Sequence, residues 1–374
     1  MEYIQVLILF VLLLLLWNML QNLKMLKDRE SLRLKKPLPL ISVLLPARNE
    51  EKNIKRCVCS LLKQNYPRLE IIVLDDNSTD RTFEIVKELS QRSKNVKIVR
   101  GKKLPPGWNG KNWACHQLSQ KANGEWFLFT DADTTHKSHS ISTALAAAQN
   151  SHSVFVTCVP GLIAKTWSEK LYMSIIHFAF VALLPFKLIN FTRHSRIPVG
   201  IGPFMLIKKD FYFSCGGYEV QKKEIVDDMA LAKVVREKSG KISVIDGTKF
   251  MDVRFYTSFK EVWNGFSKNS YEAIGGHPHY VAGIFFVCYF LFIYPYLAFW
   301  GALESHQNYS FPLCQIIVIS LIKLILALRF NTSILYGLLH PLSVIFALLI
   351  LFNSLRLSIF KKRFEWKERL YPIE

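Results

Sequence analysis

Short clusters of acidic residues are the features of this sequence that could do chemistry. Asp131 and Asp133 stand one residue apart, directly after an apolar run at 126–129. Two carboxylates at that spacing can hold a hard divalent cation through oxygen ligands. The cation would be Mg²⁺ or Mn²⁺, and it would be shared with a diphosphate. A solvated turn is the competing interpretation of so short a motif.

A second acidic cluster, at 75–80, follows the apolar run at 70–74. Carboxylates in this position, such as Asp75 and Asp76, can accept hydrogen bonds from a nucleobase N–H group or from ribose hydroxyls. The Asp-Asn-Ser-Thr-Asp sequence is also good turn chemistry by itself. The two interpretations are compatible.

Two further segments carry charged groups that could meet a substrate. The segment 107–111 contains two glycines that allow close backbone approach to an anion, and Lys111 can meet a phosphate. It is not a Walker P-loop, because the required glycine spacing is absent. Asp227 and Asp228 open an apparent helix. Such neighbours can be helix-dipole and cap residues, or one of them can be a general base beside a reacting group.

The elements that must position these residues alternate along the chain. Short apolar runs predict strands at 40–45, 70–74, 96–99 and 126–129, and helical spacing or capping residues predict helices at 50–63, 80–88 and 113–122. We expect Pro46 to end the first strand. The alternation predicts an α/β fold with a mostly parallel sheet covered by helices, in which ligands bind at the carboxyl ends of the strands.

The N-terminus reads as a membrane anchor. Residues 6–17 form an unbroken apolar run, and residues 4–20 are interrupted only by Gln5 and Asn18. A cleaved signal peptide would need a basic start and a small-residue cleavage site, and neither is present. Basic residues follow the run at positions 24, 27, 29, 33, 35 and 36. They predict that the central region is cytoplasmic.

Apolar segments return in the C-terminal third, at 280–303, 311–328 and 334–352. Three full crossings would leave the basic tail outside the cell, against the positive-inside tendency. We therefore expect one segment, either the one with Lys323 or the one with His340-Pro341, to be re-entrant or to lie in the interface. A further apolar stretch at 171–191, interrupted by Pro185 and Lys187, is expected to be one interfacial helix on the membrane.

Composition limits the partners. The chain has 48 Lys and Arg against 29 Asp and Glu, for a net charge of +19, and half of its 374 residues are hydrophobic. So apolar a chain is not disordered. No nucleic-acid motif accompanies the charge, so an anionic lipid surface is the expected partner and nucleic acid is not. Seven cysteines without a CxxC pair are expected to be reduced, buried thiols.

In order, the motifs Pro46-Ala47-Arg48-Asn49-Glu50-Glu51, Asp75 to Asp80, Asp131-Ala132-Asp133 and Asp227-Asp228 resemble those of family 2 glycosyltransferases, which have the GT-A fold. The resemblance covers roughly residues 38–270. The Trp108-x-Gly110-Lys111-x-x-Ala114 segment, the tail at 365–371 and the layout of membrane segments make the whole chain similar to bacterial carotenoid glycosyltransferases acting on 4,4′-diaponeurosporenoate. Hopanoid-associated and ceramide glucosyltransferases are similar more distantly.

This resemblance implies a UDP-sugar donor, UDP-glucose, and roles for the acidic residues. Asp75 and Asp76 would bind the uridine, Lys111 would meet the diphosphate, and Asp131 and Asp133 would hold Mg²⁺ or Mn²⁺. Asp228 would be the base of an inverting displacement. The remaining residues of the implied nucleotide-sugar site are Pro46, Arg48, Glu50 and Asp131, with Asp227 as an auxiliary residue.

One departure concerns the acceptor side. Many processive relatives carry a Gln-x-x-Arg-Trp motif after the base, whereas this chain has only Trp263 and Lys268 as candidate substitutes in the corresponding region. The departure argues against a polysaccharide synthase, as does the lack of further helices for a translocation channel.

The expected organisation is an anchor at 1–22, a cytoplasmic GT-A domain at 38–270, transmembrane segments at 280–356 and a basic cytoplasmic tail at 357–374. The expected protein is a membrane enzyme that transfers a hexose to a lipid acceptor, a C30 carotenoic acid. Diacylglycerol, a hopanoid, a ceramide-like lipid or a polyprenyl phosphate are the alternative acceptors. A non-catalytic scaffold is the alternative function, and the oligomeric state is left open.

Overall fold

A computed structural model describes residues 2–27, 33–191, 197–361, 363–366 and 369–372. Parts of the basic run after the anchor and of the basic tail lie outside these ranges. A mixed sheet of eight strands is in the order β3-β2-β1-β4-β7-β6-β8-β5. Its strands are β1 (Ile41–Ala47), β2 (Leu69–Asp75), β3 (Val96–Arg100), β4 (Trp126–Phe129), β5 (Thr134–His136), β6 (Phe155–Leu162), β7 (Met205–Lys208) and β8 (Ile242–Val253).

The pairing of the strands decides which ends meet. Of the seven ladders in the described part of this sheet, four are parallel (β1 with β2, β2 with β3, β1 with β4, β6 with β8) and three are antiparallel. Only β5 and β7 therefore run against the rest. The mostly parallel arrangement is confirmed for the first four strands, and their carboxyl ends share one edge of the sheet.

We expected Pro46 to end the first strand, but β1 continues to Ala47. Ile41 donates its N–H toward β2 and Leu44 offers its carbonyl toward β4, so even-numbered residues of β1 face β4. The β1–β4 ladder ends at Leu44, whereas the β1–β2 ladder continues to Ala47. Pro46, which has no N–H, therefore lies where no ladder bond is required of it.

Helices cover both faces of the sheet because β1 and β2 alternate their apolar side chains between two cores. One face carries α2 (Ile54–Leu62), α3 (Thr82–Arg92) and α5 (Ser140–Ser151). The other carries α4 (Gly110–Lys121), α7 (Phe186–Phe191), α8 (Lys209–Ser214) and α9 (Asp227–Glu237). A 3₁₀ turn, η2 (Gly217–Glu219), precedes α9.

Four helical segments are long and apolar enough to cross a membrane: Glu2–Leu26, Pro278–Glu304, Ser310–Arg329 and His340–Phe360. One is N-terminal and three are C-terminal, as expected. The helices that form them and connect them are α1 (Glu2–Lys27), α10 (Phe259–Ala273), α11 (Pro278–Cys288), η3 (Tyr289–Ile293), α12 (Tyr294–Glu304), α13 (Ser310–Arg329), α14 (Ile334–Leu338), α15 (His340–Arg356) and η4 (Leu357–Lys361).

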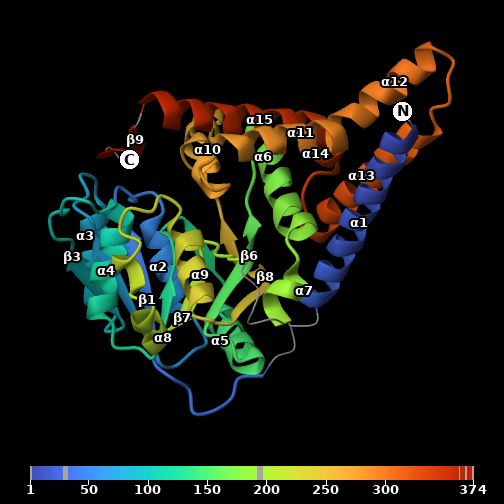
Figure 1. The fold of residues 1–374 in the computed structure, drawn as a ribbon. Helices are drawn as coiled ribbons and strands as arrows, with labels where there is room; N and C mark the ends of the chain where they lie inside the picture. Colours follow the sequence, from blue (N-terminus) through green and yellow to red (C-terminus); the bar gives the residue numbers. More distant parts are fainter. Residues whose placement is uncertain (1, 28–32, 192–196, 362, 367–368, 373–374) are drawn as a thin grey trace.

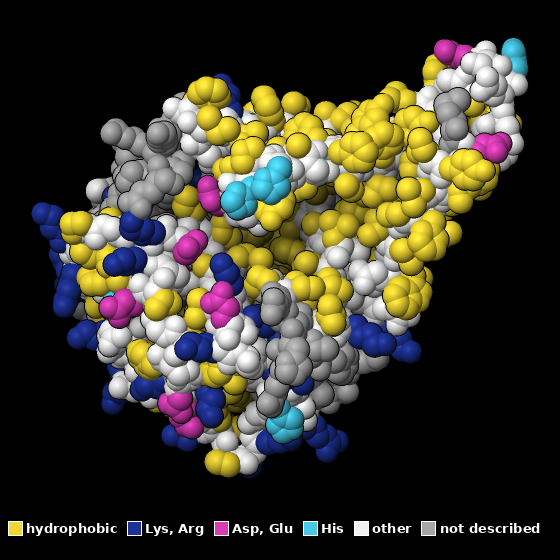
Figure 2. Space-filling model, viewed as in Figure 1, with side chains coloured by type: hydrophobic (Ala, Val, Ile, Leu, Met, Phe, Trp, Pro, Cys, Tyr) yellow, Lys and Arg dark blue, Asp and Glu magenta, His cyan; other side chains and the backbone are white. Residues whose placement is uncertain are grey.

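These helices form a layer beside and above the sheet domain (Figure 1). α1 packs along α13, while α15 runs in a different direction, across the ends of α6 (Trp167–Phe178) and α10. Hydrophobic side chains gather over this layer, and charged ones gather over the sheet domain (Figure 2). The surface is hollowed between the two regions, and hydrophobic side chains line the rim of the hollow.

The stretch 171–191 is not one helix, contrary to expectation. α6 continues as a π-helix, η1 (Ala179–Leu183), and the chain then extends at Leu184 before α7. Pro185 explains the break, because it disfavours helical backbone in the residue before it. Asn22 of α1 donates its side-chain amide to the carbonyls of Val181 (2.8 Å) and Leu184 (2.6 Å), which the break leaves exposed. A polar residue of the anchor therefore stabilises the break.

The C-terminal tail contains an antiparallel hairpin, β9 (Arg363–Trp366) with β10 (Arg369–Pro372).

Candidate active site

The sequence-predicted acidic residues meet at the shared carboxyl edge of the sheet. Asp75 is the last residue of β2, Asp131 follows β4, and Asp228 lies in the first turn of α9. Lys111, in the first turn of α4, joins them: its Nζ is 3.0 Å from Asp131 Oδ1 and 3.3 Å from Asp227 Oδ1. One ammonium group thus links three segments that are far apart in sequence.

Asp227 and Asp228 have different surroundings although they are neighbours. Asp227 is buried, and its second oxygen, Oδ2, accepts a hydrogen bond from the Tyr218 hydroxyl (3.0 Å). Asp228 is half-buried and accepts bonds from the backbone N–H groups of Gly202 (2.7 Å) and Met229 (2.8 Å). Burial, followed by the negative charge of Asp227, raises the pKa of Asp228 to about 6, although Lys111 and the two N–H groups oppose the shift. A carboxylate so tuned is suited to general-base work near neutral pH.

Gly202 lies at the centre of this cluster. A Cβ atom built there would be 3.3 Å from Asp228 Oδ2, 3.5 Å from Asp131 Oδ2 and 3.7 Å from Lys111 Nζ. The absent side chain leaves the two carboxylates and the ammonium group facing a common space. The sequence analysis did not assign Gly202 to the site. The glycine-flanked segment 200–203 before a strand was a signal that could have found it.

Two buried polar residues hold α4 against the segment that leads into α9. Asn112 donates its side-chain amide to the carbonyls of Gln221 (2.8 Å) and Glu224 (2.9 Å). Tyr218, fully buried, donates to Asp227, and burial raises the pKa of its phenol well above its usual value. Neither Tyr218 nor Asn112 is among the site residues predicted from the sequence.

At the end of β2, one carboxylate has an unused acceptor. Asp75 Oδ1 is buried without a hydrogen-bond partner, while its Oδ2 accepts a 3.4 Å bond from the backbone N–H of Ser78. Asp76 is fully buried, and its N–H bonds the carbonyl of Ala47 in β1. A buried unsatisfied acceptor is uncommon and points to a missing donor, such as a base or ribose group.

The residues after β1 bond to the loop that follows β2 and to the turn before α2. Arg48 donates from its guanidinium to the carbonyls of Asp76 (2.7 Å) and Asn77 (2.8 Å), and so ties the ends of β1 and β2 together. Glu50 opens the turn before α2 and accepts a side-chain bond from Asn53 (2.9 Å). Pro46 lies within β1, two residues before Arg48.

The oxygen ligands that a divalent cation prefers are present, but few. No group of three or more His, Cys, Asp or Glu side chains that could hold a metal occurs within the described chain. Asp131 Oδ2 faces the space around Gly202, and Asp133 follows two residues later. A cation here would therefore take its remaining ligands from a diphosphate or from water. Hard oxygen ligands of this kind fit Mg²⁺ or Mn²⁺.

The two auxiliary candidates lie on α10. Trp263 packs in an aromatic cluster, with its ring 6.0 Å from Phe259 and 6.2 Å from Phe346 of α15. Lys268 is half-buried one turn further along the helix. The contacts of Trp263 thus place it at the junction of α10 with the apolar helices.

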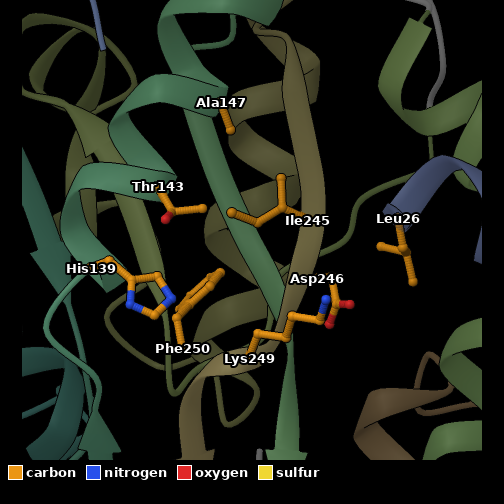
Figure 3. Close-up of a pocket in the computed structure, with 8 residues that line it drawn as sticks. All are labelled: Leu26, His139, Thr143, Ala147, Ile245, Asp246, Lys249 and Phe250. Carbon is orange, nitrogen blue, oxygen red and sulfur yellow. The ribbon is translucent and has the colours of Figure 1, made fainter. Parts of the chain in front are cut away.

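A separate cavity of about 190 Å³ lies between α5, β8 and the end of α1 (Figure 3). His139 and Phe250 line one side and Asp246 and Lys249 the other. None of the clustered carboxylates contributes to its walls.

Comparisons with known proteins bear on this arrangement. Residues 42–213 match the family described as "Glycosyl transferase family 2". The 4,4′-diaponeurosporenoate glycosyltransferase of Staphylococcus aureus (strain USA300) is 27% identical over 240 residues, or 63% of this chain and 62% of the relative. The protein of the same name from Staphylococcus haemolyticus is 26% identical over 243 residues, 64% of this chain and 63% of the relative. The match thus spans less than two thirds of these relatives.

A solved structure resembles the whole fold. It is a mannosyltransferase from Pyrobaculum calidifontis in complex with GDP-Man and Mn²⁺, which aligns with 96% of this chain and 99% of its own, at a TM-score of 0.53 and 16% identity. At that identity the likeness concerns the fold. Residues 42–213 thus carry a glycosyltransferase family 2 domain, and the eight-stranded sheet that contains them has the GT-A fold.

Proposed function

We propose that the chain is an inverting glycosyltransferase that moves glucose from UDP-glucose to an apolar acceptor held in the membrane. The acceptor is the carboxylate of a C30 carotenoic acid of the 4,4′-diaponeurosporenoate type, and the product is its sugar ester. The observation that carries the proposal is the convergence of Lys111, Asp131 and Asp228 on the space around Gly202.

The chemistry follows from the positions of these groups. Asp75 and Asp76 hold the nucleoside, and Lys111 meets the diphosphate. Asp131 and Asp133 would hold a divalent cation, which would supply positive charge against the departing diphosphate. The acceptor oxygen bonds to the anomeric carbon as the bond from that carbon to the diphosphate oxygen breaks on the opposite face. The configuration of the sugar therefore inverts.

Asp228 acts according to the acceptor. A hydroxyl acceptor must lose its proton, and a carboxylate with a pKa near 6 can take it at neutral pH. A carboxylic acid is already ionised at neutral pH, so no proton needs to move. In that case Asp228 has no proton to take, and its carboxylate, held by the N–H groups of Gly202 and Met229, only shapes the site.

An aromatic route supports an apolar acceptor. Burial, and then the charges of Asp133 and Asp131, raise the pKa of the Tyr256 phenol. The Tyr256 ring is 5.0 Å from Phe266, and Phe266 stacks on Tyr172 of α6 at 4.0 Å. Tyr172 in turn is 6.1 Å from Phe346 of α15.

The route ends at exposed rings. Trp167 at the start of α6 is 56% exposed and Phe259 at the start of α10 is 46% exposed, and the two stack at 5.5 Å. Both lie near Phe346 on the apolar helix layer. An acceptor with a long apolar chain can lie on these rings while its polar end reaches the carboxylates.

The relatives support the identity of the acceptor. The two staphylococcal proteins are named for 4,4′-diaponeurosporenoate, and the mannosyltransferase was solved with a nucleotide sugar and Mn²⁺. The proposal carries these substrate classes to this chain, with glucose as the sugar.

The test offers purified full-length protein UDP-glucose or GDP-mannose together with 4,4′-diaponeurosporenoate or diacylglycerol. We expect glucosyl ester from UDP-glucose and the carotenoic acid, at a rate that Asp228→Asn reduces. Sugar on the glycerolipid alone would overturn the acceptor, and mannose transfer alone would overturn the donor. The absence of product and of nucleotide binding in every combination would favour a non-catalytic scaffold.

A further inference from the structure

A polar cluster inside the layer of apolar helices takes no part in the proposed reaction. Lys323 of α13, His340 of α15 and His177 of α6 are only 2%, 1% and 3% exposed. Lys323 Nζ lies 5.6 Å from the Phe178 ring centre, and the His340 ring lies 5.2 Å from the same ring. His177 precedes Phe178, and its ring stacks on Phe330 with the ring centres 4.2 Å apart.

The nitrogens of this cluster are largely unsatisfied. Lys323 donates to the carbonyl of Ser174 (2.8 Å) but makes no ion pair within the described chain. Both ring nitrogens of His340 and Nε2 of His177 are buried without a hydrogen-bond partner. A buried amine without an anionic partner and ring nitrogens without hydrogen bonds are costly in an apolar environment. Ionisable residues at membrane depth therefore commonly mark binding sites.

The cluster lies near the end of α13 that adjoins the catalytic domain. Arg329, the last residue of α13, pairs with Asp246 of β8, so this end of α13 adjoins the catalytic domain. Lys323 is six residues before Arg329, or roughly 9 Å along the helix axis. The polar layer of a bilayer leaflet is about 5–8 Å thick. If α13 crosses the membrane with Arg329 at the surface, Lys323 lies just below the head-group layer, within reach of a lipid head group.

We propose that Lys323, His340 and His177 form a binding site for the head group of an anionic membrane lipid. The cluster supplies several nitrogen donors and no carboxylate, which suits an oxyanion. The rings around it, Phe178, Phe292 and Phe330, are apolar. These rings favour an amphiphile over free phosphate. The lipid would join α6, α13 and α15, the helices that stand beside the aromatic route to the carboxylates.

The experiment measures lipid-dependent stability of the full chain in uncharged detergent after delipidation. Melting temperature and bound lipid are recorded with phosphatidylglycerol, phosphatidylcholine or inorganic phosphate. We expect phosphatidylglycerol alone to raise the melting temperature, by about 3 °C or more at saturation. Lys323→Met should lose this response and bind phosphatidylglycerol at least ~10-fold more weakly, because a buried charge partner has been removed.

Comparing the stability of Lys323→Met and the parent without lipid separates a lipid site from a purely structural role of Lys323. Without lipid, Lys323→Met should be at least as stable as the parent, because the variant removes an uncompensated buried charge. Lys24→Met is the matched control, since Lys24 is exposed near the end of α1, and it should respond to phosphatidylglycerol like the parent.

Three results would overturn the proposal. They are an unchanged response in Lys323→Met, an equal response of the parent to phosphatidylcholine, and a response to inorganic phosphate alone. If Lys323→Met does not fold, His340→Phe replaces it, because this variant removes unsatisfied nitrogens without breaking a hydrogen bond. It should also weaken phosphatidylglycerol binding, and unchanged binding would count against the site.

Discussion

Asp227 and Asp228 show why residue type and spacing leave roles undecided. The sequence presents them as two equal carboxylates at a helix start. In the structure Asp227 pairs with Lys111 and accepts a hydrogen bond from the Tyr218 hydroxyl. Asp228 instead accepts bonds from backbone N–H groups and faces Gly202. The distinction depends on residues from other elements, and no local pattern contains it.

The first prediction concerns Asp228→Asn. We expect turnover to fall roughly 10²–10⁴-fold with a hydroxyl acceptor, because the base is lost. The loss should lie at the low end of this range with a carboxylic acid, which is already ionised. UDP binding, measured by calorimetry, should be unchanged. Asp210→Asn, an exposed change on α8, is the control, and equal turnover in both variants would reduce Asp228 to a helix cap.

The second prediction concerns pH. Since the pKa of Asp228 is raised to about 6, the ionised base is present above pH 6 and is lost below it. With a hydroxyl acceptor, kcat/KM should fall about tenfold for each pH unit below 6. Asp227→Asn removes a negative neighbour that raises this pKa, so the acidic limb should move to lower pH. A limb that stays in place would show that another group titrates.

The third prediction concerns the metal. Mg²⁺ or Mn²⁺ should be required, and Asp133→Asn should lose most activity, because the cation neutralises the departing diphosphate. The measurement is the transfer rate against cation concentration after chelation. Asp133→Asn should raise the concentration that is needed, while Asp210→Asn, an exposed change on α8, should not. Full activity in excess chelator would contradict this prediction.

At the scale of elements, the sequence predicted the first four strands but not how the later strands pair with them. Local apolar runs located β1, β2, β3 and β4 and the acidic clusters after them. The antiparallel insertion of β7 between β4 and β6 depends on pairing between residues about 80 apart in the chain. Such pairing leaves no local signal. The same holds for Asn112, whose role exists only once the segment before α9 is in place.

Asn22 gives the fourth prediction. Its side chain donates to two carbonyls at the break before α7 and accepts from the N–H of Phe186 (3.2 Å). Asn22→Leu should destabilise the protein by about 2–4 kcal/mol, because it leaves buried backbone groups unsatisfied. Thermal unfolding in detergent measures this. Gln21→Leu, on the exposed side of α1, should be neutral. If α1 were only an anchor, Asn22→Leu would be neutral or stabilising, since it adds apolar surface.

At the scale of the whole molecule, the structure suggests which C-terminal segment does not cross the membrane. Three full crossings there would leave the basic tail outside the cell. α11 to α12 and then α13 can form an outward and a returning segment. The pairing of Arg329 with Asp246 holds the end of α13 at the catalytic domain. α15 runs in a different direction from α1 and α13 (Figure 1), so it need not cross with them. Of the segment with Lys323 and the segment with His340-Pro341, the second is therefore the better candidate for lying in the membrane interface.

The fifth prediction tests this arrangement. If α1, α11 to α12 and α13 cross and α15 lies in the interface, the tail from Lys361 onward is cytoplasmic. Five basic residues near the end of the chain also favour that side. The measurement uses a membrane-impermeant maleimide on intact cells, with Cys314 changed to Ala. A cysteine in place of Glu374 should be labelled only after lysis, whereas one in place of Gln307, between α12 and α13, should be labelled at once. Labelling of position 374 from outside would mean that α15 crosses as well, and that the positive-inside tendency fails in this chain.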